Sequence, residues 1–196
     1  MPKTGMRPIR TTSVVTATIA EVGRVGSLDV TVSQIADKAG VSSALVHHYF
    51  GGKEDVFLAA MRHILTAFGD EVREALAAAT TPRERLDAII RASFSLRNFQ
   101  PETISAWLNF YVLAQTSSGA SRLLSVYHKR LSSNLRYNLR QLTDRDPEPV
   151  ARGIAAMIDG LYLRYALRPR ELNATDAHEV VSAYLNDALA RSKSID

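Results

Sequence analysis

Apolar residues recur at steps of three and four along most of the chain, and no stretch alternates apolar and polar positions with a period of two. The first spacing is typical of amphipathic helices, which turn one apolar face toward a core. Prolines fall between the apolar stripes, where they mark helix ends. Beyond residue 50 the expected helices cover residues 53–77, 82–98, 101–115, 120–142, 147–168 and 174–191. The pattern therefore predicts an all-α fold of about nine helices.

Shorter elements fill the first part of the chain. A helix over residues 9–25 is expected to end at Gly26. A two-turn helix is then expected to stop at Gly40, because glycine adopts the left-handed conformation of a C-cap without strain. Ser42 can cap a further helix over residues 43–49 by accepting a backbone N–H. Two short helices joined by a tight turn predict a helix-turn-helix, whose second helix enters the major groove of DNA.

The second helix of this motif carries side chains suited to DNA. Hydroxyls and ring nitrogens can reach phosphates and base edges, and Ala44 leaves room for a thymine methyl group. Lys53 begins the next helix, where its charge and free backbone N–H groups can meet a phosphate. Val46 and Phe50 are expected to face inward. The predicted DNA-binding residues are Thr31, Ser33, Ser42, Ser43, Ala44, His47, His48, Tyr49 and Lys53, the alternative being that the two histidines are ordinary surface residues.

Composition narrows the class of protein. The 196 residues include no cysteine, which excludes a disulfide framework, a thiolate metal site and a cysteine nucleophile. The net charge of +4 is compatible with a polyanionic partner. No run resembles a membrane span or a signal peptide, so we expect a cytoplasmic chain without a membrane partner. No nucleophile, base and orienting group can be assembled, and we expect neither an enzyme nor a metal or other cofactor.

Residues 31–57 resemble the DNA-binding domain of the TetR family of bacterial repressors. The resemblance depends on Ile35, Ala36, Ala39, Gly40, Val41, Ser42, Phe50 and Lys53. The segments MPKTGMRPIR, ISAWLNFY, RLSSNLR and AAMIDGLYLR are similar to the BetI type of this family, the choline-responsive repressors of glycine betaine synthesis. The resemblance implies a homodimer that binds a palindromic operator in double-stranded DNA and releases it when choline binds. We accordingly expect a DNA-binding domain at residues 8–68 and an effector-binding and dimerisation domain at residues 69–196.

Most aromatic residues lie between residues 94 and 165, where an effector site is expected. A quaternary ammonium cannot donate a hydrogen bond, so a choline site needs aromatic faces and preferably a carboxylate. Trp107 and Tyr111 share one helix face, and Asp159 and Tyr162 share another. We therefore predict that these four residues form a cage for a cationic effector. The alternatives are that the aromatic rings belong to the core, that Asp159 pairs with an arginine such as Arg164, and that the effector is another lipophilic cation or small molecule.

Overall fold

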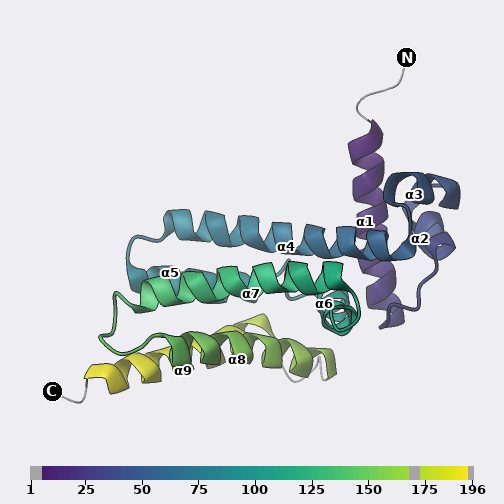
Figure 1. The fold of residues 1–196 in the computed structure, drawn as a ribbon. Helices are drawn as coiled ribbons and strands as arrows, with labels where there is room; N and C mark the ends of the chain where they lie inside the picture. Colours follow the sequence, from purple (N-terminus) through teal and green to yellow (C-terminus); the bar gives the residue numbers. More distant parts are fainter. Residues whose placement is uncertain (1–5, 168–172, 194–196) are drawn as a thin grey trace. The chain divides into compact units, whose positions relative to one another are not determined.

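The computed structural model describes residues 6–167 and 173–193, and within them the chain forms nine α-helices and no strand (Figure 1). The helices are α1 (Met6–Val25), α2 (Val32–Ala39), α3 (Ser43–Phe50), α4 (Lys53–Ala78), α5 (Pro82–Ser93), α6 (Pro101–Leu113), α7 (Ser118–Leu139), α8 (Glu148–Leu167) and α9 (Ala174–Lys193). The predicted all-α fold is confirmed. Pro169, expected to follow the end of α8, lies outside the described residues. No helix in the described ranges has the length and apolar character needed to cross a membrane.

Several helices end earlier than the apolar pattern predicts. The clearest case is α5, which ends at Ser93, whereas the pattern extends to Asn98. The Nδ2 group of Asn98 donates to the carbonyl oxygen of Ala92 at 2.9 Å. This side-chain bond satisfies a carbonyl at the helix end, where the next helical N–H is missing. The Ala92 carbonyl therefore keeps a hydrogen-bond partner at the point where the chain leaves the helix.

The first of two compact units contains the described residues up to Leu65 together with Pro101–Leu123. Within it α1 packs against α2 and α6, and α2 packs against α3. Gly23 allows a close approach of α1 to α6, because a Cβ atom added there would lie 2.6 Å from the Cα atom of Glu102. Buried side chains of this unit include Val14, Val22, Ile35, Val46, Met61 and Phe110. The sequence predicted one domain up to residue 68 and a second from residue 69 onward, and this boundary stays a prediction.

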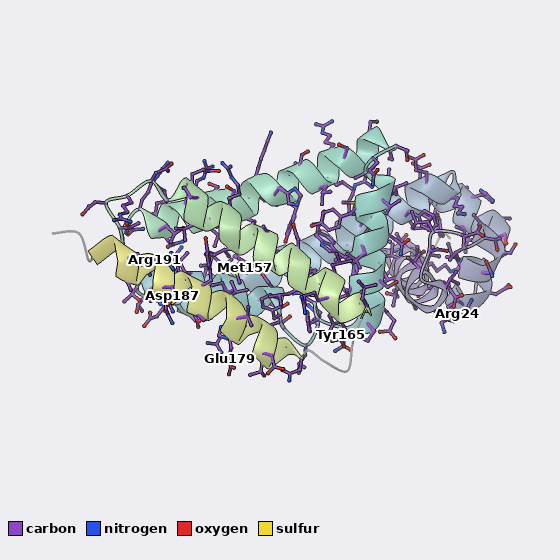
Figure 2. The ribbon with its side chains drawn as sticks, turned by 90° about the horizontal axis from the view of Figure 1, so that it is seen from below. Arg24, Met157, Tyr165, Glu179, Asp187 and Arg191 are labelled. Atoms are coloured by element: carbon purple, nitrogen blue, oxygen red, sulfur yellow. The ribbon has the colours of Figure 1, made fainter. Side chains whose placement is uncertain are left out.

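The second unit contains Thr66–Gln100 and the described residues from Leu124 onward. Within this unit α9 packs against α5 and α8, and α8 and α9 lie side by side (Figure 1). The Tyr184 hydroxyl occupies the space beside Gly153, where a side chain on α8 would stand. Figure 2 shows the outer surface of α9, on which Glu179, Asp187 and Arg191 are exposed. Buried side chains of the unit include Leu86, Ile90, Leu135, Ile154, Ile158 and Leu185.

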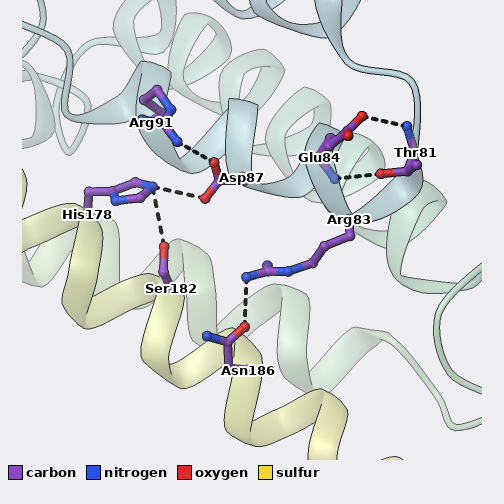
Figure 3. Close-up of polar contacts among 8 residues, drawn as sticks. All are labelled: Thr81, Arg83, Glu84, Asp87, Arg91, His178, Ser182 and Asn186. Atoms are coloured by element: carbon purple, nitrogen blue, oxygen red, sulfur yellow. Dashed lines mark hydrogen bonds and ion pairs between the residues drawn. The ribbon is translucent and has the colours of Figure 1, made fainter.

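A capping box opens α5. The Thr81 hydroxyl accepts the Glu84 backbone N–H at 3.2 Å, and the Glu84 carboxylate accepts the Thr81 backbone N–H at 2.9 Å (Figure 3). The same carboxylate accepts the Thr80 hydroxyl at 2.7 Å and the Thr80 backbone N–H at 2.8 Å. The hydroxyl bond from Thr80, followed by the backbone bonds from Thr81 and Thr80, lowers the pKa of Glu84 from 4.5 to about 2.

This low pKa predicts how stability depends on pH. A carboxyl group with a lowered folded-state pKa stabilises the protein fully above its unfolded pKa of 4.5, and its contribution disappears as the pH falls toward about 2. We expect Glu84→Gln to be less stable than the wild type at neutral pH, with the difference shrinking through this range. Urea unfolding at several pH values measures it, with the exposed Glu74→Gln as the control. A difference that stays constant down to about pH 2 would contradict the role of the charge.

Candidate nucleic-acid interface

The turn between α2 and α3 follows the local chemistry of its residues. Gly40 has φ 68° and ψ 34°, in the left-handed region. Its backbone N–H donates to Asp37 at 3.2 Å, and the Val41 N–H donates to Ala36 at 3.0 Å, which closes the end of α2. The Ser42 hydroxyl accepts the Leu45 backbone N–H at 3.2 Å. Both predictions for this turn, the glycine C-cap and the serine N-cap, are confirmed.

Three predicted DNA-binding residues, Thr31, Ser33 and Ser43, also form hydrogen bonds within the motif. The Thr31 hydroxyl accepts the Gln34 backbone N–H at 3.2 Å, and the Gln34 side chain accepts the Thr31 backbone N–H at 2.7 Å. This capping box starts α2. The hydroxyl oxygens of Ser33 and Ser43 lie 3.3 Å apart and join α2 to α3. Thr31 and Ser33 are exposed, so they are also available to a phosphate.

The two faces of α3 differ in burial as a recognition helix requires. Val46 is buried on the inner face, as predicted, and Phe50 is half-buried. Ala44, His47 and His48 are exposed, at spacings of three and four residues that place them on the outer side of the helix. The exposed face of α3 therefore presents a small apolar side chain and two imidazole rings.

His47 is held in one orientation by the end of its own helix. Its Nδ1 atom lies 2.9 Å from the carbonyl oxygen of Gly51. A carbonyl oxygen can only accept, so in the neutral imidazole Nδ1 carries the hydrogen and Nε2 keeps its lone pair. Nε2 can then accept a hydrogen bond from the exocyclic amine of adenine or cytosine. The sequence did not predict this orientation, because it depends on the backbone conformation of Gly51, which has φ 87°.

Lys53, at the start of α4, offers a charge to a phosphate. Its Nζ atom lies 5.5 Å from the centre of the Phe57 ring, which steadies the half-buried side chain. The Asp55 carboxylate accepts the backbone N–H of Gly52 at 3.2 Å. The Glu54 carboxylate, in the same first turn, accepts the Ser117 hydroxyl at 2.6 Å. The Gly52 N–H is therefore already satisfied within the protein, and the Lys53 side chain adds a positive charge at this helix start.

The predicted effector residues fall in different units. Trp107 and Tyr111 lie on α6 in the first unit, with ring centres 5.6 Å apart and planes 83° apart. Asp159 and Tyr162 lie on α8 in the second unit. The buried Tyr162 hydroxyl donates to the Ser93 carbonyl oxygen. The spacing of each pair along its helix agrees with the prediction, while the cage of all four residues stays a prediction.

Tyr162 belongs to an aromatic cluster that the sequence did not reveal. Its ring centre lies 6.0 Å from that of Phe94 and 5.8 Å from that of Phe99. The rings of Phe99 and Tyr165 lie 4.4 Å apart. Phe94 and Phe99 follow the end of α5, so helical spacing gave no sign that they would meet residues of α8.

Both the N-terminal and the C-terminal part of the chain are similar in sequence to known protein families. Residues 14–60 match the family of bacterial regulatory proteins named tetR, and residues 82–190 match the BetI-type transcriptional repressor C-terminal domain. The HTH-type transcriptional regulator BetI of Brucella anthropi is 51% identical over 186 residues, which cover 94% of this chain and 96% of that protein.

Solved structures share the fold. A transcriptional regulator from Pseudomonas aeruginosa PAO1 has a TM-score of 0.81 at 26% identity, over 94% of this chain and 92% of its own. A transcriptional regulator from Saccharomonospora viridis, crystallised in complex with choline, has a TM-score of 0.78 at 20% identity, over 90% of this chain and 95% of its own. The second likeness is one of fold alone.

Proposed function

Because the chain belongs to the TetR family of bacterial regulators and carries a BetI-type C-terminal domain, we propose that it represses glycine betaine synthesis from choline and leaves its operator when choline binds. The resemblance drawn from residues 31–57 and the later segments is confirmed. The chain is a DNA-binding transcriptional regulator and not an enzyme, as expected. The observation that carries the proposal is the identity of 51% over 94% of the chain with a regulator named BetI.

A symmetric dimer on a near-palindromic operator is part of the proposal. The exposed apolar residues Leu163 and Leu167 of α8 and Val180 of α9 support a homodimer, because such side chains are more stable when a second subunit covers them. Two copies of α3 would then reach successive major grooves about 34–36 Å apart. We place the repressor in the cytoplasm, where bacterial DNA lies.

Choline is proposed as the effector. The regulator from Saccharomonospora viridis that shares this fold was crystallised with choline, which supports the choice. Release from DNA requires choline to bind the DNA-free form more tightly than the DNA-bound form. Thermodynamic linkage then requires DNA to weaken choline binding by the same factor.

A fluorescence anisotropy titration on the DNA upstream of the chain's own gene tests the proposal. We expect choline to weaken operator binding by at least about tenfold, which corresponds to about 1.4 kcal/mol of coupling. The matched control is 3,3-dimethylbutanol, which has the shape of choline without its charge and should leave the complex intact. Operator binding that ignores choline would contradict the choline response. No binding to this DNA at low salt would contradict repression at this site.

A further inference from the structure

A groove of about 410 Å³ runs along the second unit, between the later part of α4, α5 and the first turns of α9. Small side chains keep it open, namely Ala75 of α4 with Ala88 and Ala92 of α5. Phe94 and Leu96, which follow α5, add apolar surface to its lining. A concave site with apolar walls and a few polar groups is the usual form of a small-molecule site.

Glu71 brings a negative charge to the groove. Its Oε2 atom accepts the Nδ2 group of Asn98 at 2.7 Å, and the buried Asn98 side chain is held in turn by the Ala92 carbonyl. Within the part of the chain that the structure describes, Glu71 makes no ion pair. The carboxylate is therefore oriented by a neutral amide, with no cation of the described chain in ion-pair contact.

Phe94, which lines the groove together with Glu71, belongs to the aromatic cluster of Phe99 and Tyr162. The ring of Phe94 meets those of Phe99 and Tyr162 edge to face, at interplanar angles of 82° and 88°. Burial raises the pKa of Tyr162, and the negative charges of Asp159 and Glu71 raise it further. Both carboxylates thus act on the same aromatic cluster. Negative potential beside aromatic faces attracts a cation that cannot donate a hydrogen bond.

Arg91 brings a positive charge to the lining, and this charge is paired with the Asp87 carboxylate. Arg91 lies with its Nη2 atom 2.5 Å from Oδ2 of Asp87 (Figure 3). The other Asp87 oxygen lies 3.0 Å from Nε2 of His178, a residue that also lines the groove. Asp87 therefore offsets the charge of Arg91, and Glu71 is the acidic residue of the lining that no cation of the described chain opposes.

From these observations we infer that the groove binds a quaternary ammonium ion, with the Glu71 carboxylate as its counter-charge and Phe94 as its aromatic wall. The inference rests on the proposed function, because it gives a place to the effector of the same repressor. It differs from the cage predicted from sequence, which contains neither Glu71 nor Phe94. Ser95 and Thr175 in the lining supply hydroxyl groups for the alcohol of choline.

Isothermal titration calorimetry of the full-length protein with choline tests the groove. Glu71→Gln keeps an acceptor for Asn98 but removes the charge, so we expect affinity to fall at least about tenfold. Ala88→Leu fills the groove from α5 without removing core packing, and we expect it to abolish measurable binding. The matched control is Glu74→Gln on the same helix, whose exposed side chain is outside the lining and should leave affinity unchanged.

The outcomes separate the groove from the proposed function. Unchanged choline affinity in Glu71→Gln overturns the groove; if Trp107→Ala then removes binding, the effector site is elsewhere and the choline response stands. Binding of tetramethylammonium that depends on Glu71, without binding of choline, supports the groove and overturns choline as the effector. A wild-type protein that binds neither ion overturns both proposals.

Discussion

Replacing His47 and His48 together by glutamate is expected to weaken operator binding by at least about 100-fold, or about 2.7 kcal/mol. Both side chains are exposed on the outer face of α3, so their replacement removes no buried contact. Two carboxylates on this face would lie against the phosphates and base acceptors of the DNA major groove. Placing like charges opposite one another costs several kcal/mol. Anisotropy titration with the operator at about 100 mM salt measures the loss.

A control with the same change in net charge tests whether position matters. Lys129 and Arg130 are exposed on α7, and replacing both by glutamine also lowers the charge by two units. We expect this variant to bind the operator within a few-fold of the wild type, because its altered residues lie outside the helix-turn-helix. An equal loss in the two double variants would contradict the assignment of α3 as the recognition helix, as would full affinity in the histidine variant.

Gly23→Ala is expected to destabilise the protein by about 2 kcal/mol. The added Cβ atom would lie 2.6 Å from the Cα atom of Glu102, which is backbone and cannot turn aside. Overpacking of this kind costs about 1–3 kcal/mol, and the better helix propensity of alanine recovers up to about 1 kcal/mol. Urea unfolding at constant m-value measures the difference.

Gly69→Ala is the matched control for this prediction. Gly69 also lies inside a helix, but among the described residues no atom outside its chain neighbours and the adjacent backbone of α4 lies within 4 Å of the Cβ position. Helix propensity then acts alone, and we expect a gain of up to about 1 kcal/mol. If both alanine variants change stability in the same direction and by the same amount, α1 and α6 do not approach as closely as described.

The helix-turn-helix could be predicted closely because its chemistry is local. Thr31, Gly40 and Ser42 act on backbone groups within four residues of themselves. Their bonds depend on spacing along the chain and on side-chain type, both of which the sequence states. The bounds of α3 were accordingly predicted to within one residue, while the orientation of His47 needed the conformation of Gly51.

The groove could not be predicted, because its parts are distant in sequence. Glu71, Phe94 and Thr175 come together through the packing of three segments. Asn98 was expected to end a helix, whereas it lies beyond α5, where its side chain holds Glu71. Helical spacing did identify Trp107 and Tyr111 as neighbours, since four residues separate them on α6.

Amino-acid order alone established the helical class, the DNA-binding motif and the family, because periodicity, caps and motif residues are read along the chain. Packing decided which helices meet, including the contact of α1 with α6 at Gly23 and the groove beside Glu71. The physical reason is that an apolar stripe shows which face of a helix avoids water and not which partner covers it. Many different helix pairs could cover the same apolar stripe. Side-chain shape and charge select among these pairs only in the folded chain.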